Sequence, residues 1–474
     1  MKHYDVIVIG SGGASKITSP AARLGKKVAC IEKDALGGTC LNRGCIPSKM
    51  LIHPADVAAQ IKSARKFDIT VDTHFKVDFN RLVTRISDTV DSESAGIVAG
   101  YNRNPNIDYY PGAAKFVSDK VVEVNHERLT APVIVIGVGA RPQIPTIPGL
   151  AGTPYMTSTD ALRRRDLPKK MIVIGASYIA AELGHAYGAL GTETHFLVRS
   201  RLLRREDRQV SEEFTKVFAQ QYPVHIGAVP INVNYQNSQF TVTYQNNGRQ
   251  DMMTADALLI ATGVVSNADT LALENTVIEL DDHNFVKVDE YLQTTVDGVY
   301  ALGDCIGRYF YRHSVNFEGE YLFNLLYGNK TPQPIRYPPV PHAVFSSPQV
   351  AGVGKTEEEL KAAGVDYVAG VNPYAKSAMG MALLAEHGFC KILIERGSKK
   401  ILGAHIVGDE ASNMIHMIIA LMTKDGTLDD LLSMIYIHPA LPEIVRNAAR
   451  KAKEALKQNS SGQDTRNKVQ TIDK

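Results

Sequence analysis

The sequence predicts an α/β protein with two successive parallel-sheet units, followed by a smaller α+β region. The first observation is an apolar, β-branched run, Tyr4–Ile9, that leads directly into the glycine turn Gly10–Ser15. Such runs are typical of strands buried in a parallel sheet. The same order recurs at Met171–Ile174 and Gly175–Glu182, so the unit occurs twice. A chain of 474 residues is also too long for one core and implies about three domains.

The first glycine turn predicts a dinucleotide site in a Rossmann-like unit. Gly10, Gly12 and Gly13 let backbone N–H groups approach a pyrophosphate at the start of the next helix. Glu32 closes the following strand and is placed to bind ribose hydroxyls. Ser15 occupies the third glycine position of the fingerprint. Because a lone glycine fingerprint is common in loops, the assignment depends equally on the flanking strand and on Glu32.

The second glycine turn predicts a second dinucleotide, and the residues after its second strand indicate which one. Gly175 opens the turn, and Ser177 replaces the second glycine with a side chain small enough to be tolerated. The next strand ends at Arg199, where an NAD-binding unit usually places a carboxylate. Arg204 and Arg205 follow closely. Guanidinium groups suit a 2′-phosphate, so NADP is favoured over NAD; the alternative is an arginine-rich solvated surface.

Two cysteines, Cys40 and Cys45, lie in the segment Gly37–Lys49. Their spacing is wrong for the common zinc clamp, and no second Cys or His pair follows nearby, so a metal site is disfavoured. If the segment is helical, a small distortion brings the two sulfurs within disulfide range. A redox pair is the favoured interpretation, and two ordinary buried cysteines are the alternative.

The segment Gly37–Lys49 closely resembles the redox-active disulfide of the class I pyridine nucleotide-disulfide oxidoreductases. This family includes glutathione reductase, dihydrolipoamide dehydrogenase, mycothione reductase and mercuric reductase. By this resemblance Cys40 is the interchange thiol that attacks the substrate, Cys45 faces the flavin, and Lys49 lies near the flavin's reactive nitrogen. The resemblance extends from residue 1 to about residue 452. It implies FAD in the first unit, NADP or NAD in the second, and an obligate homodimer.

The resemblance also implies roles for residues outside the cysteine segment. Asp304 would bind the ribityl and pyrophosphate region of FAD, although a helix N-cap would use the same residue. Glu182 would pair with Lys49 across the flavin, and Tyr178 would cover the flavin until the nicotinamide displaces it. The remaining positions that we assign to cofactor binding are Gly38, Thr39, Gly139, Gly263 and Gly303.

A thiolate pair needs a proton shuttle, and imidazole suits this task near neutral pH. His438 precedes Glu443, with Pro439 and Pro442 between them. These prolines forbid a regular helix, so the carboxylate can fold back to orient the imidazole and favour imidazolium. Most of the fourteen histidines are expected to be ordinary surface or core residues. The family, however, carries a His-Pro-x-x-x-Glu signature, in which the histidine completes the active site of the other subunit.

Composition argues against several other classes of protein. The hydrophobic fraction of 44% and the net charge of +2 indicate neither a nucleic-acid nor a membrane partner. No apolar run approaches the length of a membrane span, and no signal-peptide core precedes the first strand. Five cysteines fit a reducing compartment with one functional pair. We therefore expect a cytoplasmic protein.

The motifs divide the chain into five parts. Pro142, Pro145 and Pro148 indicate a stiff linker at the first boundary, and the polar stretch Gln458–Asp464 near the end of the chain is expected to be frayed. The parts are an FAD-binding domain with the redox disulfide (1–150), an NAD(P)-binding domain (151–268), a return to the FAD domain (269–338), an α+β dimerisation domain (339–452) and a polar tail (453–474).

Two functions fit these motifs best. In the first, NADPH passes a hydride through FAD to the Cys40–Cys45 disulfide and on to a low-molecular-weight disulfide, as in mycothione reductase. The alternative is dihydrolipoamide dehydrogenase, which uses NAD and a lipoyl-bearing E2 subunit of a 2-oxo-acid dehydrogenase complex. The arginines after Val198 favour the first function. A flavin-loaded electron-transfer or binding protein with structural cysteines is a third possibility.

Overall fold

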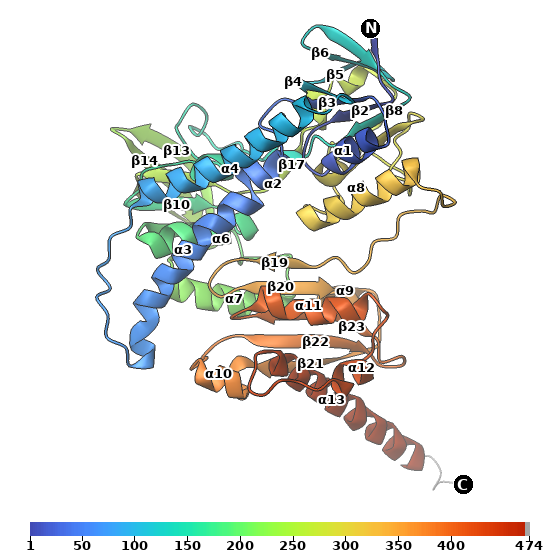
Figure 1. Cartoon of the computed structure of the whole chain (residues 1–474). Helices are drawn as coiled ribbons and strands as arrows, with labels where there is room; N and C mark the ends of the chain where they lie inside the picture. The colour runs from blue at the N-terminus through green and yellow to red at the C-terminus, as the bar shows by residue number, and fades with distance from the viewer. Residues whose placement is uncertain (470–474) are drawn as a thin grey trace.

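The structure is a computed structural model that describes the backbone of residues 1–469 and the side chains of residues 1–458. Two α/β lobes lie side by side and a third, mainly antiparallel lobe lies across them (Figure 1). The first lobe contains both the N-terminal strands and the later helix α8, Arg312–Tyr327. Within the described part of the chain, no helix is long and apolar enough to span a bilayer.

The first lobe is built on a five-stranded parallel sheet whose order is β18-β8-β2-β3-β4. A smaller four-stranded sheet, β1-β7-β6-β5, lies beside it. The parallel sheet confirms the predicted strand before the first glycine turn. The elements are β1 Lys2–His3, β2 Val6–Ile9, α1 Ser15–Arg23, β3 Val28–Glu32, β4 Ile107–Pro111, β5 Lys115–Ser118, β6 Val121–Val124, β7 Glu127–Thr130, β8 Val133–Ile136, β18 Val299–Ala301 and η4 Gly303–Ile306.

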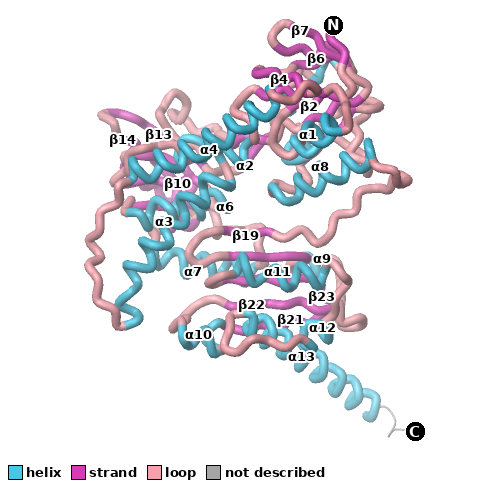
Figure 2. The backbone as a smooth tube through the Cα atoms, in the orientation of Figure 1, coloured by secondary structure: helices cyan, strands magenta, loops and turns pink. Residues whose placement is uncertain are grey.

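The cysteine segment and the polar stretch after it are mainly helical. Figure 2 shows a long loop between helix α3, Cys45–Ser63, and helix α4, Phe79–Asn102. Asp78 caps the third helix by accepting the Arg81 N–H at 2.9 Å. The elements are α2 Gly38–Arg43, α3 Cys45–Ser63, η1 Ala64–Phe67 and α4 Phe79–Asn102.

The second lobe has a parallel sheet in the order β12-β11-β10-β16 and an antiparallel sheet, β13-β14-β15. The first sheet confirms the second predicted dinucleotide-binding unit. The elements are α5 Ser158–Ala161, β10 Lys170–Ile174, α6 Tyr178–Leu190, β11 Glu193–Val198, α7 Arg208–Gln221, β12 Val224–Ile226, β13 Ala228–Gln236, β14 Gln239–Asn246, β15 Arg249–Ala255 and β16 Ala257–Ile260.

Two segments connect these lobes, and they run side by side. Strand β9, Ala140–Pro142, leaves the first lobe, and β17, Val264–Ser266, returns to it. The two strands pair in antiparallel register, with Val264 opposite Pro142. The predicted proline linker therefore begins in a paired strand, because Pro142 is the last residue of β9. Two short helical turns follow the return, η2 Ala268–Thr270 and η3 Leu273–Asn275.

The third lobe is an antiparallel sheet in the order β19-β20-β23-β22-β21 with helices packed against it. Helix α13 continues through most of the expected frayed tail, so that expectation is wrong up to residue 469; residues 470–474 lie outside the described part. The elements are β19 His342–Val344, β20 Val350–Gly354, α9 Glu357–Ala362, β21 Tyr367–Pro373, η5 Tyr374–Lys376, α10 Ala378–Ala382, β22 Phe389–Glu395, β23 Ile401–Val407, α11 Ala411–Met422, α12 Leu428–Ser433 and α13 Pro442–Val469.

Candidate active site

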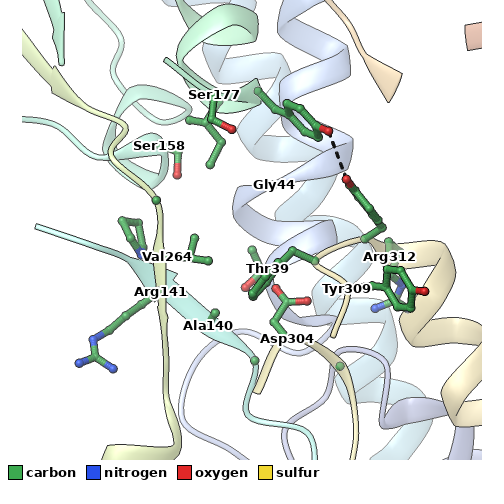
Figure 3. A pocket seen from close by; sticks show the side chains of 18 of the residues that line it. Thr39, Gly44, Ala140, Arg141, Ser158, Ser177, Val264, Asp304, Tyr309 and Arg312 are labelled. Carbon is green, nitrogen blue, oxygen red and sulfur yellow. Dashed lines mark hydrogen bonds between the residues drawn. The ribbon is translucent and has the colours of Figure 1, made fainter. Parts of the chain in front are cut away.

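One large cavity, with a volume of about 2420 Å³, is lined by residues of all three lobes. Figure 3 shows residues of the cysteine segment, the connecting strands and the second glycine turn around it. Every cofactor-binding residue that the sequence predicts lines this cavity, and so do Cys40, Cys45 and Lys49. The exceptions among the predicted site residues are His438 and Glu443. Both glycine turns line this cavity, so it offers binding groups for two dinucleotides.

The floor of the cavity is bare backbone at the first glycine turn. Gly38 has a φ of +67°, and a Cβ on it would lie 2.6 Å from the Cα of Gly12. A Cβ on Gly10, at φ +100°, would lie 2.2 Å from the carbonyl oxygen of Gly137. Any side chain at these positions would therefore clash. The turn leaves room for a pyrophosphate to approach the N-terminal end of helix α1.

Glu32 is fixed at this turn by three hydrogen bonds. Its Oε2 accepts the Ser11 N–H at 2.9 Å and the Ser11 hydroxyl at 2.8 Å. Its Oε1 accepts the Asp34 N–H at 3.0 Å. The Ser11 Oγ in turn accepts the Gly37 N–H at 3.0 Å. The sequence does not single out Ser11, yet this hydroxyl joins the ribose-binding carboxylate to the cysteine segment.

Asp304 lies in the short turn η4, next to a second buried carboxylate. Glu318 accepts the Gly303 N–H at 2.7 Å and the Tyr337 hydroxyl at 2.7 Å. Burial and the neighbouring Glu318 raise the pKa of Asp304 to about 6. Asp304 also lines the cavity, where a carboxyl group can bond hydroxyl groups of a ligand, so the residue fits the expected FAD contact.

The substitution Asp304→Asn is expected to stabilise the FAD-free protein at neutral pH. The pKa rises from 3.8 to about 6 on folding, so the folded state holds a proton that the unfolded chain releases, and stability falls as the pH rises through about 6. At about 1.4 kcal/mol per pKa unit, the cost approaches about 3 kcal/mol in free energy of unfolding. Thermal midpoints at about pH 4 and about pH 7.5 span most of this change. An equal pH dependence in wild type and variant would contradict the assignment.

The two cysteines lie at the junction of two helices. Cys40 is in α2, Cys45 begins α3, and Gly44 between them has φ −141° and ψ −115°, outside the helical region. The distortion that the sequence predicts is therefore a complete break in the helix. Both thiols are free in the structure.

Cys40 is the cysteine of this pair that ionises at the lower pH. A hydrogen bond from Cys45 lowers the pKa of Cys40 to about 7 against the opposing effect of burial, and the cations Arg312 and Lys49 assist. The same hydrogen bond and burial raise the pKa of Cys45. One thiolate and one thiol then share a proton, and the thiolate is the nucleophilic form.

Lys49 forms an ion pair with Glu182 that joins the lobes beside the cysteines. The Lys49 Nζ lies 2.8 Å from the Glu182 Oε2 and 4.5 Å from the centre of the Phe345 ring. The other oxygen of Glu182 accepts the Phe345 N–H at 3.0 Å. The structure thus brings together the two residues that the resemblance pairs, and adds Phe345 from the third lobe.

Tyr178 begins helix α6 and takes part in a polar cluster that the sequence does not reveal. Its hydroxyl donates to the buried Glu206 and lies 3.3 Å from the Tyr311 hydroxyl. Its ring stacks on those of Tyr311 and His342, with centroids 6.3 and 6.2 Å apart. Burial opposes ionisation of Glu206, but the charge and hydrogen bond of His342 outweigh it and leave the pKa of Glu206 lowered.

The residues expected to bind the second nucleotide lie at the same end of the cavity. Ser177 is the N-cap of α6, and its hydroxyl makes no capping hydrogen bond. Arg199, Arg204 and Arg205 are exposed and line the cavity. None of the three forms an ion pair with a carboxylate among residues 1–458. An unpaired cluster of guanidinium groups near a helix N-terminus is suited to bind phosphate.

His438 and Glu443 meet as the two prolines predict, but outside this cavity. The His438 Nδ1 lies 2.9 Å from the Glu443 Oε2. The imidazole is 69% exposed, whereas the carboxylate is 4% exposed and also pairs with Arg446 at 2.7 Å. The hydrogen bond from His438 lowers the pKa of Glu443. The preceding Ile435 and Ile437 are 101% and 81% exposed, so this segment presents an apolar surface with an oriented imidazole.

Comparison with known proteins defines the class to which this fold and site belong. Residues 4–319 match the pyridine nucleotide-disulphide oxidoreductase family, and residues 340–449 match the dimerisation domain of that family. The chain therefore belongs to the pyridine nucleotide-disulphide oxidoreductases, which are FAD-dependent enzymes that use NAD(P)H and act on sulfur groups. The match to the dimerisation domain supports a homodimer.

Two curated relatives are equally similar to the chain. Mycothione reductase of Mycobacterium tuberculosis is 34% identical over 463 residues, which covers 94% of this chain and 99% of that protein. Dihydrolipoyl dehydrogenase of Bacillus subtilis is 34% identical over 457 residues, which covers 94% of this chain and 96% of that protein. A solved structure, the HOCl-induced flavoprotein disulfide reductase RclA from Escherichia coli, matches with a TM-score of 0.82 and 27% identity, covering 93% and 98% of the two chains.

The observed residues fit the cofactors that the family uses. The bare-backbone floor, Glu32 and Asp304 suit FAD, and the second turn with its arginines suits a pyridine nucleotide. Within the described residues, no group of three or more His, Cys, Asp or Glu side chains has the geometry to hold a metal ion.

Proposed function

We propose that the protein is a homodimeric, NADPH-dependent flavoprotein reductase of a low-molecular-weight disulfide, similar to mycothione reductase. The observation that carries the proposal is the position of the Cys40–Cys45 pair in a cavity that both glycine turns also line. The unpaired arginines at the second turn favour NADPH over NADH. We assign the FAD, NAD(P) and dimerisation domains to residues 1–150 with 269–338, 151–268 and 339–452, and place the protein in the cytoplasm because its cysteines are few and free.

The first glycine turn, Glu32 and Asp304 would hold FAD, which would supply hydride chemistry between NADPH and the Cys40–Cys45 disulfide. The Cys40 thiolate then attacks one sulfur of the substrate disulfide, which forms a mixed disulfide and releases one substrate thiolate. His438 of the partner subunit protonates this leaving group. Cys45 then gives up its proton and its sulfur attacks the Cys40 sulfur, which releases the second substrate thiolate to take up that proton and restores the Cys40–Cys45 disulfide.

The other site residues hold this arrangement. Glu443 keeps the His438 imidazole oriented through Nδ1. Lys49 and Glu182 place a fixed cation one helical turn from Cys45. Glu32 and Asp304 bind hydroxyls of FAD, and Tyr178 closes the nicotinamide site until the nucleotide enters.

Dihydrolipoamide dehydrogenase is the second candidate, because a relative with that activity is as similar to the chain as mycothione reductase. That function would use NAD and a lipoyl-bearing E2 subunit. A panel of small disulfides and dihydrolipoamide, assayed with both nicotinamides, separates the two. Fast oxidation of dihydrolipoamide by NAD, with no reduction of small disulfides, would overturn the proposal.

The substitution Arg199→Glu is expected to reverse the nucleotide preference. A carboxylate repels the 2′-phosphate but accepts hydrogen bonds from a free ribose. Each charge-assisted contact contributes about 1.5–3 kcal/mol, so the variant should lose roughly ten- to a hundredfold in NADPH affinity. Stopped-flow flavin reduction with each nucleotide, at two salt concentrations, is the measurement, and salt should weaken the wild-type preference.

Arg208→Glu is the matched control, because Arg208 is equally exposed but pairs with Glu212 at 2.7 Å and does not line the cavity. This variant should keep the wild-type preference. If the wild-type protein prefers NADH, the arginines form a solvated surface, and dihydrolipoamide dehydrogenase becomes the leading function.

A further inference from the structure

Arg204 and Arg205 lie in a tight turn between buried residues. Leu203 is 1% exposed, and Glu206 and Asp207 are 3% and 0% exposed. The Glu206 N–H donates to the Leu203 carbonyl oxygen at 2.9 Å, which closes the turn around Arg204 and Arg205. The direction in which these guanidinium groups point therefore depends on what holds the turn at each end.

Each end of the turn is held by a different domain. Leu203 packs in the core of the second lobe, and its N–H donates to the Ala176 carbonyl oxygen at 2.7 Å. At the other end, Glu206 and Asp207 are both bonded by side chains of the third lobe. His342 lies 2.6 Å from Glu206, and the Lys391 Nζ lies 3.0 Å from each oxygen of Asp207.

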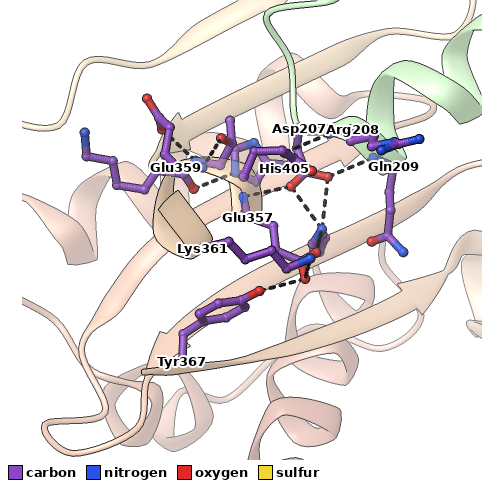
Figure 4. Close-up of polar contacts among 12 residues, drawn as sticks. Asp207, Arg208, Gln209, Glu357, Glu359, Lys361, Tyr367 and His405 are labelled. Atoms are coloured by element: carbon purple, nitrogen blue, oxygen red, sulfur yellow. Dashed lines mark hydrogen bonds and ion pairs between the residues drawn. The ribbon is translucent and has the colours of Figure 1, made fainter. Parts of the chain in front are cut away.

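Lys391 is a buried cation at the boundary between the second and third lobes, where it bonds Asp207 and Glu357. Figure 4 shows these two carboxylates in their hydrogen-bonded cluster. Lys391 projects from strand β22, and its side chain is 0% exposed, as is that of Asp207. Glu357 lies at the start of α9. Asp207 in turn accepts the Glu357 N–H at 3.1 Å and caps α7 by accepting the Gln209 N–H at 3.1 Å.

Lys391 supplies the positive charge that compensates buried Asp207, whereas the Gln209 and Glu357 N–H groups supply only neutral hydrogen bonds. A buried carboxylate without a cationic partner has a large desolvation cost, and relaxation towards solvent relieves it. Asp207 can reach solvent only if the chain before it moves as well, and that chain is the turn with Arg204 and Arg205. The strength of the Lys391–Asp207 pair is therefore coupled to the position of the turn.

We propose that Lys391 is a positioning residue for the pyridine nucleotide. By holding Asp207, the dimerisation domain fixes the turn that presents Arg204 and Arg205 to the 2′-phosphate of NADPH. The inference rests on the proposed function of these arginines. It adds that the selectivity for NADPH is set in part by a residue of another domain that never touches the nucleotide.

The test compares Lys391→Met with Lys361→Met in the full-length, FAD-loaded dimer. Lys361 also pairs with Glu357, at 2.8 Å, but is 62% exposed and does not bond Asp207. Both variants remove one positive charge from the same ionic cluster. Trypsin should cut after Arg204 or Arg205 about tenfold faster in Lys391→Met, because the turn opens more often, and at the wild-type rate in Lys361→Met. Mass spectrometry identifies the cut.

Nucleotide binding gives the second readout. In stopped-flow flavin reduction, Lys391→Met should raise the NADPH concentration at half-maximal rate about tenfold, while that for NADH changes little, because NADH has no 2′-phosphate. A general loss of structure would weaken the binding of NADPH and of NADH equally. If Lys391→Met does not fold, Lys391→Gln, which keeps a neutral hydrogen-bond donor beside Asp207 but no charge, should show the same two changes to a smaller extent.

Equal tryptic rates in the Lys391 and Lys361 variants would overturn the inference, as would a faster cut with an unchanged NADPH-to-NADH ratio. A wild-type preference for NADH would instead overturn the proposed cofactor. In that case the tryptic comparison still decides whether Lys391 holds the turn.

Discussion

Replacing Cys40 with serine is expected to abolish disulfide reduction while FAD stays bound. Cys40 is the thiol with the lowered pKa, about 7, and it is the nucleophile in the proposed mechanism. A serine hydroxyl does not ionise in this range, so no mixed disulfide forms. NADPH consumption with a small disulfide measures the loss, and the flavin absorbance shows that FAD is retained. In the wild type, turnover should rise as the pH increases through about 7, because the thiolate fraction increases.

The reciprocal variant, Cys45→Ser, is the matched control for this assignment. Cys40→Ser should still show a long-wavelength thiolate–flavin band on reduction, because Cys45 is the thiol assigned to face the flavin. Cys45→Ser should lack this band but still form a stable mixed disulfide with substrate, because nothing resolves it. Exchanged behaviour of the two variants would reverse the assignment, and full activity of both would make the cysteines structural.

Replacing His438 with alanine is expected to slow turnover by about two to four orders of magnitude, the usual span for a lost general acid–base group. The leaving thiolate then departs without a proton donor. Reduction of the flavin by NADPH should be unchanged, because His438 lies outside the cavity that holds both nucleotide sites. Steady-state turnover and anaerobic flavin reduction, measured in parallel, separate the two half-reactions. Near-normal turnover would remove His438 from the mechanism.

A mixed dimer tests where His438 acts. Cys40→Ser and His438→Ala are each inactive in their own homodimers. If His438 serves the cysteines of the partner subunit, a heterodimer of the two variants contains one complete site, with Cys40 from one chain and His438 from the other. Activity should reappear when the variants are co-expressed. If the heterodimer is inactive, His438 works within its own chain or not at all.

The sequence predicts the parts of this site that depend on local patterns. A buried strand followed by a glycine turn needs only neighbouring residues to be recognised, and both such turns line one cavity. The His438–Glu443 contact also follows from adjacent prolines. The carboxylate and the imidazole are close because the chain between them cannot continue as a helix.

The cluster around Glu206 could not be predicted in this way. Tyr178, Glu206, Tyr311 and His342 come from separate segments, and a glutamate after several arginines reads as part of a solvated surface. The role of Lys391 could not be predicted either. It interrupts an otherwise apolar strand, and its partner, Asp207, is distant in sequence. Buried polar groups are chosen by their tertiary partners, and a single sequence does not contain that information. The tail was misjudged because its polar composition does not exclude the helix that the structure shows up to Val469.

The paired strands β9 and β17 restrict how the two nucleotide-binding lobes can move. A lobe attached through one flexible segment can rotate widely, but here both covalent connections are hydrogen-bonded to each other between Ala140 and Ser266. Rotation of the second lobe would have to bend this ribbon as a unit. Opening and closing of whole lobes is therefore a poor way to admit and release nucleotide in each turnover. Access to the flavin would be better controlled by a single side chain, and Tyr178, which lines the cavity, is the side chain that we propose for this role.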